Sequence, residues 1–144
     1  MIARLGYLPG IMRTLAPILI LASLLAVSPA AAKPITVKTG ESWLFSLYRG
    51  EPVRARKIKP QTKPSEGQVM VTVTSMMGTT MTISSNNPVA YTYQAELVGA
   101  DKTTAARSCT LPANSRLSFE HWPEKATAVR LSHFRIASKD GTCP

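Results

Sequence analysis

Apolar and polar residues alternate with a period of two along most of the chain from residue 33 onward. The clearest run is Gln68–Ser75, where Val69, Val71 and Val73 fall on one face and Thr72 and Thr74 on the other. This period is typical of half-buried β-strands. The same rule predicts strands at Pro34–Thr39, Ser42–Arg49, Val53–Lys59, Gln68–Ser75, Thr79–Ser84, Val89–Val98, Ala105–Leu111, Arg116–Glu120 and Thr127–Ile136.

The pattern also predicts which side chains face a core. In the second predicted strand, Trp43, Phe45 and Leu47 fall on one face, and in Arg116–Glu120 we expect Leu117 and Phe119 to point inward. Turn-forming residues separate the strands, for example Gly50-Glu51-Pro52. Short strands at this spacing, with no helical stripe, favour an all-β sandwich or small barrel in a single domain.

One stretch resembles a known architecture. The run Ile83–Pro88, followed by Tyr91–Leu97, resembles the strand, Asn-rich turn and strand of immunoglobulin-like domains in exported bacterial proteins. More loosely, the whole chain resembles small exported bacterial proteins with such a domain. The resemblance implies an antiparallel immunoglobulin-like β-sandwich of seven to nine short strands. It implies no activity, and the spacing of 34 between Cys109 and Cys143 is shorter than in antibody-type domains.

The first 32 residues read as a secretory signal peptide, which we expect to be helical. Arg4 and Arg13 give a positive start, and Leu15–Val27 is an uncharged apolar run of 13 residues. Small residues at Ala30 and Ala32 then predict cleavage before Lys33. The run is too short for a membrane span, which needs about 20 apolar residues.

This division predicts the localisation and the domain boundaries. We expect residues 1–32 to be removed and residues 33–144 to form one β-sandwich domain in the periplasm or outside the cell. The residue directly after the cleavage site is Lys33 and not Cys, so a lipoprotein is disfavoured, and we expect no transmembrane anchor in the mature chain. Translation from Met1 and from Met12 both remain open, because either start leaves a complete signal.

Two cysteines, Cys109 and Cys143, lie in the mature part. In an oxidising compartment such a pair predicts a structural disulfide. Residues 33–144 also carry 15 of the 17 basic residues and all eight acidic ones, a net charge of +7. Positive charge favours anionic partners such as lipid head groups or acidic glycans, although it also simply favours solubility.

Basic residues concentrate between Arg49 and Lys63, a segment that contains a single acidic residue, Glu51. Charge of this kind protects an edge strand from pairing, and it can also form a contact patch for an anionic lipid, a glycan or a protein partner. Nucleic acid is disfavoured, because no aromatic residue lies between Val53 and Lys63 to stack on bases. The candidate patch comprises Arg49, Arg54, Arg56, Lys57, Lys59 and Lys63.

An alternative hypothesis is a copper or zinc site, although we expect no cofactor. His121, His133 and Glu120 are ligand types that zinc accepts, and methionine thioethers suit Cu(I). The methionines Met76, Met77 and Met81 resemble those of periplasmic copper-handling sandwiches, but the alternating His and Met motifs of those families are missing.

A third hypothesis is a small hydrolase, but the sequence offers few of the motifs that hydrolysis requires. It holds no nucleophile-elbow, zinc-protease or phosphate-loop motif. The sequence therefore favours a non-enzymatic exported module and leaves its process, partner and oligomeric state open.

Overall fold

The computed structural model describes residue 10, residues 33–139 and residues 141–143. The predicted signal peptide, with Ala32, lies outside the described residues apart from residue 10. Among the described residues no helix is long and apolar enough to cross a membrane. The described chain forms nine strands, β1 (Ile35–Lys38), β2 (Ser42–Tyr48), β3 (Glu51–Ile58), β4 (Gln68–Ser75), β5 (Thr79–Ser85), β6 (Tyr91–Val98), β7 (Thr103–Ala106), β8 (Leu117–Trp122) and β9 (Ala128–Ile136).

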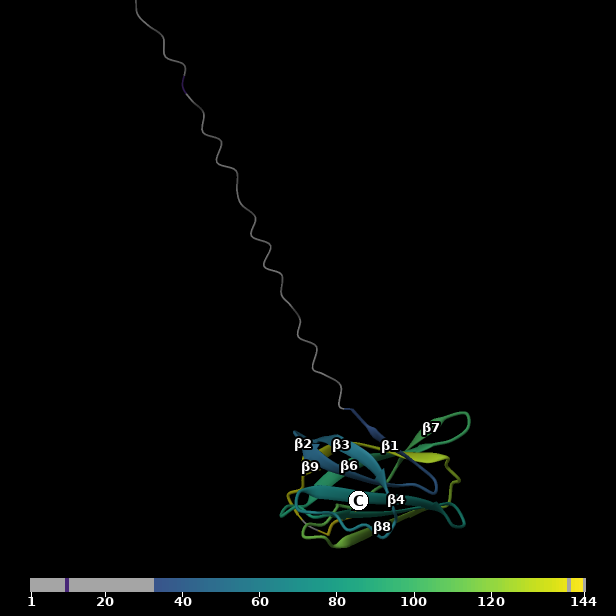
Figure 1. Ribbon diagram of the computed structural model, residues 1–144. Coiled ribbons are helices and arrows are strands. Elements are labelled where there is room, and N and C mark those ends of the chain that lie inside the picture. The colour runs from purple at the N-terminus through teal and green to yellow at the C-terminus, as the bar shows by residue number, and fades with distance from the viewer. Residues whose placement is uncertain (1–9, 11–32, 140, 144) are drawn as a thin grey trace, which may run out of the picture.

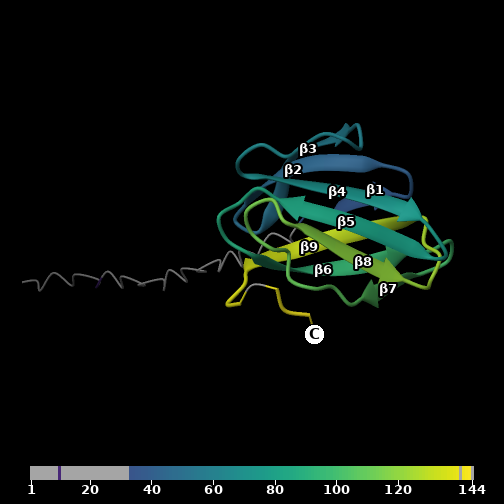
Figure 2. The same cartoon turned by 90° about the horizontal axis from the view of Figure 1, so that it is seen from below.

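The strands form two antiparallel sheets, which Figures 1 and 2 show as two layers. The four-stranded sheet has the order β1-β9-β6-β7, and the five-stranded sheet has the order β3-β2-β4-β5-β8. The predicted all-β class is confirmed. Sheet order departs from chain order at β1, which pairs with β9 so that Ile35 lies opposite Leu131.

The core lies between the two sheets. Val69, Val71 and Val73 of β4 are fully buried, as their alternation predicts. Phe134 of β9 contacts rings from both layers, with centroids 5.7 Å from Phe45 and 5.6 Å from Tyr93. Aromatic pairs of this kind stabilise a core by about 0.5–1.5 kcal/mol beyond the area that they bury.

The turn between β2 and β3 differs from the prediction. It consists of Arg49 (φ 51°) and Gly50 (φ 80°), while Glu51 and Pro52 belong to β3. Two residues with positive φ form the tight hairpin turn that suits the twist of paired strands. Pro52 is tolerated within the strand because β3 is an edge and pairs only with β2.

The prediction of which β8 side chains point into the core is wrong. Leu117 and Phe119 are each 63% exposed, whereas Glu120 and Trp122 are buried. The inner face of β8 covers the irregular segment 107–110 instead of the centre of the opposite sheet. There the Trp122 indole donates to the Arg107 carbonyl at 2.9 Å, and the Glu120 carboxylate accepts from the Cys109 amide. The inner face of β8 therefore combines burial of the Trp122 ring in the core with these two hydrogen bonds.

The predicted strand at residues 105–111 is also corrected. β7 ends at Ala106, and Leu111 forms only an isolated bridge with Tyr91. The segment between them is held by the predicted disulfide between Cys109 and Cys143, which the structure confirms. Closing a loop of this length stabilises the fold by roughly 3–4 kcal/mol in the chain-entropy model.

Candidate functional site

The basic residues predicted as a contact patch lie on β3 and on the turn and loop at its two ends. All six are exposed: Arg49 in the turn, Arg54, Arg56 and Lys57 in the strand, and Lys59 and Lys63 in the loop that leads to β4. We call these six residues the basic edge. The structure therefore places Arg49, Arg54, Arg56, Lys57 and Lys59 along the β3 edge of the five-stranded sheet, whereas Lys63 lies further along the loop, over the outer face of that sheet.

A β-bulge shapes the middle of the basic edge. The register between β2 and β3 shifts between Leu44 and Ser46, and Arg54 in the opposing stretch has a φ of 52°. Bulges increase the local twist of an edge and disrupt its pairing ladder. Among the described residues, β3 pairs with β2 alone, so its outer side faces solvent with a bulged, charged surface.

One lysine of the basic edge is neutralised. Lys57 lies opposite Trp43 and forms an ion pair with Glu41 at 2.7 Å. The indole nitrogen of Trp43 donates to the same carboxylate at 2.9 Å. The hydrogen bond from Lys57 and then that from Trp43 lower the pKa of Glu41 to about 2. Lys57 is thus committed to holding the strand in place.

The turn end of the basic edge borders a cavity of about 500 Å³ between β2, β6 and β9. The guanidinium of Arg49 lies 5.3 Å from the centre of the Tyr48 ring, a cation–π distance. Arg135 of β9 lines the same cavity, together with the apolar side chains of Leu47, Tyr91 and Ile136. We call this cavity the turn hollow.

Sequence reasoning missed Arg135 as a member of this region. It lies 86 positions after Arg49 and belongs to the other sheet. Only the contact between the β2–β3 turn and β9, where the Phe134 amide donates to the Gly50 carbonyl at 3.2 Å, brings the two arginines to one place. No local sequence signal encodes that contact.

The loop end of the basic edge folds over the outer face of the five-stranded sheet. The side-chain amide of Asn86 donates to the Pro64 carbonyl at 3.1 Å and holds the loop beside β5. Lys63, Met70 and Leu117 then line a groove of about 480 Å³. The groove carries one basic side chain, so it extends the basic edge without adding an acid.

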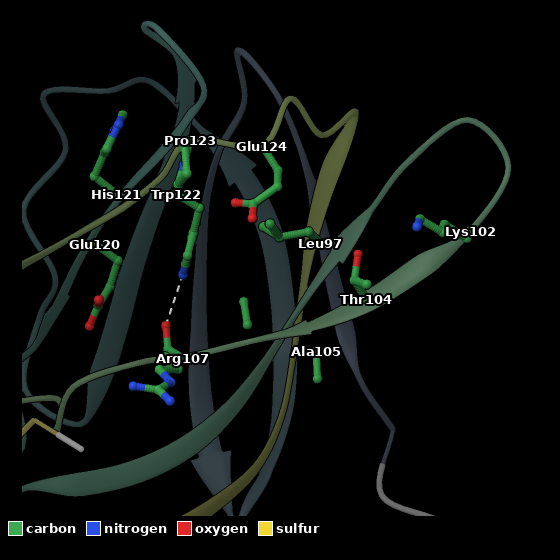
Figure 3. A pocket seen from close by; sticks show the side chains of 11 residues that line it. Leu97, Lys102, Thr104, Ala105, Arg107, Glu120, His121, Trp122, Pro123 and Glu124 are labelled. Carbon is green, nitrogen blue, oxygen red and sulfur yellow. Dashed lines mark hydrogen bonds between the residues drawn. The ribbon is translucent and has the colours of Figure 1, made fainter.

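A second candidate region is the slot of about 610 Å³ between β7 and β8 (Figure 3). Glu120, Trp122 and Glu124 project from the β8 side, while Lys102 and Arg107 come from the β7 side. Charges of both signs therefore line it. A slot of mixed charge has no preference for anions, in contrast to the basic edge.

Glu120, which lines the slot, has a shifted pKa. Burial raises the pKa of Glu120 above its ordinary value, against the opposing effect of the hydrogen bond from the Cys109 amide. Burial, followed by the nearby charge of Glu120, also raises the pKa of Tyr93. The Tyr93 hydroxyl has no hydrogen-bond partner in the part of the chain that is described. Of these two groups, only the Glu120 carboxylate is held by a backbone hydrogen bond, from the Cys109 amide.

The metal ligands proposed as an alternative lie apart. His121 is on β8 in the five-stranded sheet, with Nδ1 2.9 Å from the Thr80 hydroxyl, and His133 is on β9 in the other sheet, 2.9 Å from the Ser132 hydroxyl. Figure 3 shows the side chains of His121 and Glu120 pointing in different directions, although both residues line the slot. Among the described residues, no three His, Cys, Asp or Glu side chains form a group that could hold a metal.

The methionines are also divided between two environments. Met76 and Met77 are 64% and 90% exposed in the β4–β5 turn, whereas Met81 is fully buried in the core. A Cβ on Gly78 in this turn would lie 2.2 Å from the Trp122 carbonyl, so the turn packs against the end of β8. Packing and turn geometry account for these residues.

Comparisons with known proteins add no identity: the chain matches no protein-family model, no curated protein and no solved structure.

Proposed function

We propose that this protein is an exported, non-enzymatic module that binds an anionic component of the cell envelope through its basic edge. The fold that we propose is the immunoglobulin-like variant of the two-sheet arrangement. Export is supported by the signal-type pattern of residues 1–32 and by the Cys109–Cys143 disulfide, because such bonds persist in oxidising compartments.

One observation carries the binding proposal. Six exposed basic residues lie along one edge strand and its two ends, and among the described residues only Lys57 of these six has an ion pair with an acid. Charged side chains protect an edge strand from pairing with another chain. A set this large with so little neutralisation creates a positive field that attracts an anionic surface.

A vesicle-binding assay tests the proposal. We expect the oxidised protein to cosediment with vesicles that contain anionic lipid, and not with zwitterionic vesicles, in a manner that weakens as salt rises. The triple variant Arg54→Gln, Arg56→Gln, Lys59→Gln should lose about a hundredfold in affinity, since each basic residue near such a surface contributes about 1 kcal/mol.

The matched control removes the same charge elsewhere. Lys102, Lys125 and Lys139 are exposed and lie outside β3 and its flanking turn and loop, so their replacement by Gln gives an equal net charge. The control variant should retain most of the binding. Equal losses in the two triple variants would show a nonspecific effect of net charge, and salt-independent binding would contradict the proposal outright.

A further inference from the structure

The turn hollow, introduced above as the cavity between the β2–β3 turn and β9, is built by a close backbone contact. A Cβ on Gly50 would lie 2.5 Å from the Phe134 carbonyl oxygen and 2.6 Å from Nη1 of Arg135. Only glycine fits this approach, and its φ of 80° requires the same residue. The backbone of the turn is therefore fixed against β9 by the close approach of Gly50 and by the hydrogen bond from the Phe134 amide to the Gly50 carbonyl.

This contact places two guanidinium groups on one rim. Arg49 and Arg135 are both exposed, and neither has an ion pair with a carboxylate in the described part of the chain. Arg135 donates from Nη1 to the Phe134 carbonyl at 3.0 Å, which orients its guanidinium and leaves its other N–H groups available. Both arginines line the turn hollow, so an oxyanion bound there would be attracted by two positive charges.

The rest of the lining is apolar. Leu47 and Tyr91 pack against the core, and Ile136 is 71% exposed at the mouth. Within the described part of the chain, no acidic residue lines the hollow. An apolar wall beside two cations suits a ligand that has both an oxyanion and an apolar face. A sugar acid or sugar phosphate has both, because the C–H face of a sugar ring packs on aromatic and aliphatic side chains.

We propose that the turn hollow binds an acidic sugar residue, with its carboxylate or phosphate between Arg49 and Arg135 and its ring against Tyr91. The inference rests on the proposed function, since it names the ligand class at the turn end of the basic edge. The proposal distinguishes specific binding of a sugar in the turn hollow from general electrostatic attraction of an anionic surface to β3. The first needs geometry at Arg135, and the second needs only the field of the remaining charges.

Titration of the oxidised protein by NMR tests the site with four probes: glucuronate, glucose 6-phosphate, glucose and inorganic phosphate. We expect the two acidic sugars to shift the resonances of Arg49, Tyr91 and Arg135, and the one with the better oxyanion fit to bind more tightly. Glucose and inorganic phosphate should each bind about tenfold more weakly, because each lacks one half of the recognition.

Two variants and one control complete the test. Arg135→Gln should weaken binding of the acidic sugars about tenfold or more. Tyr91→Leu should abolish their advantage over inorganic phosphate. The control is Arg130→Gln on the same strand, whose guanidinium already pairs with Glu96 at 3.2 Å, and it should leave the affinity unchanged.

The outcomes distinguish the two proposals. Inorganic phosphate binding as tightly as the sugars would overturn the inference, as would an Arg135→Gln variant with undiminished affinity. If Arg135→Gln binds anionic vesicles normally and no acidic sugar binds the native protein, the inference fails and the proposed function stands. If acidic sugars bind but the β3 triple variant still cosediments fully with anionic vesicles, the proposed function fails instead.

Discussion

β3 and β8 are the two edges of the same five-stranded sheet, and they are built in opposite ways. β3 exposes its basic side chains and contains a bulge. An ion pair joins its Lys57 to Glu41, the residue before β2. β8 has an unbroken register with β5, exposes Leu117 and Phe119, and buries Glu120 and Trp122. β3 exposes its basic side chains, whereas β8 buries its one carboxylate.

The difference teaches how each edge is held. Charge and a bulge protect β3 against pairing with another chain, and the same charge makes it suited to an anionic partner. β8 is held from within, by the hydrogen bonds of Glu120 and Trp122 to the segment that carries the disulfide. Its outward side has neither charge nor bulge, so β8 is the edge on which unwanted pairing should begin.

The largest expected effect is on the free energy of unfolding, and it tests whether β8 is held by its buried face. Trp122→Ala should lower the free energy of unfolding by about 3–5 kcal/mol, because it leaves a cavity and an unpaired Arg107 carbonyl. Phe119→Ala, three positions earlier on the same strand, should change the free energy of unfolding by about 0.5 kcal/mol or less, since the ring is mostly exposed. Urea unfolding monitored by fluorescence and far-UV circular dichroism measures both. Similar losses in the two variants would mean that β8 is not held from within.

Such a result would also bear on how far the fold could be predicted. The strands of the sheet centre followed from alternation, because at β4 one face meets a purely apolar core and the pattern has a single solution. At β8 the rule selected Leu117 and Phe119 as the inward pair, since they are the more apolar. It could not foresee that the inner face meets backbone groups of segment 107–110, where a carboxylate and an indole are better satisfied.

The candidate site divides in the same way. The basic edge could be read from the sequence because its six residues are close in the chain and β3 is a local element. The turn hollow could not, because Arg49 and Arg135 meet only through the contact of a turn with a strand of the other sheet. Long-range contacts of this kind depend on the packing of the two layers, and a single sequence gives no direct signal for them.

A smaller effect should appear in the pH dependence of stability, with opposite signs at the two edges. The pKa of Glu41 falls from 4.5 to about 2 on folding, so its contribution to stability is complete above pH 4.5 and is lost as the pH falls toward 2. The pKa of Glu120 rises, so its contribution is complete below pH 4.5 and is lost as the pH rises through its folded pKa. As the pH increases, the stabilising contribution of Glu41 beside β3 therefore grows, and that of Glu120 on β8 declines.

Two isosteric variants isolate these contributions. Glu41→Gln should be less stable than the native protein at pH 7 and equal to it near pH 2. Glu120→Gln should match the native protein near pH 4 and gain on it as the pH approaches 7. Thermal unfolding from pH 2 to 8 measures both differences. Parallel pH profiles for the two variants would contradict the assignment of opposite shifts.

The smallest effect concerns association. Phe119→Lys should leave the free energy of unfolding within about 0.5 kcal/mol of the native value. It should nevertheless slow aggregation on heating, because it gives β8 the kind of charge that protects β3. Light scattering during a thermal ramp detects the change. The reverse variant, Arg56→Val, should speed aggregation, and the two edges would be equivalent if neither substitution altered its rate.

The pairing of β1 with β9 has a consequence for the order of folding. β9 lies inside the four-stranded sheet, between β1 and β6, and it is also the last of the strands in the described residues. Until Ala128–Ile136 has been synthesised, β1 lacks its partner strand, so the four-stranded layer cannot be completed and folding depends on a contact between the two ends of the domain. For the exported protein that we propose, that delay keeps the polypeptide competent for threading across a membrane, and folding is completed on the far side, where the disulfide can form.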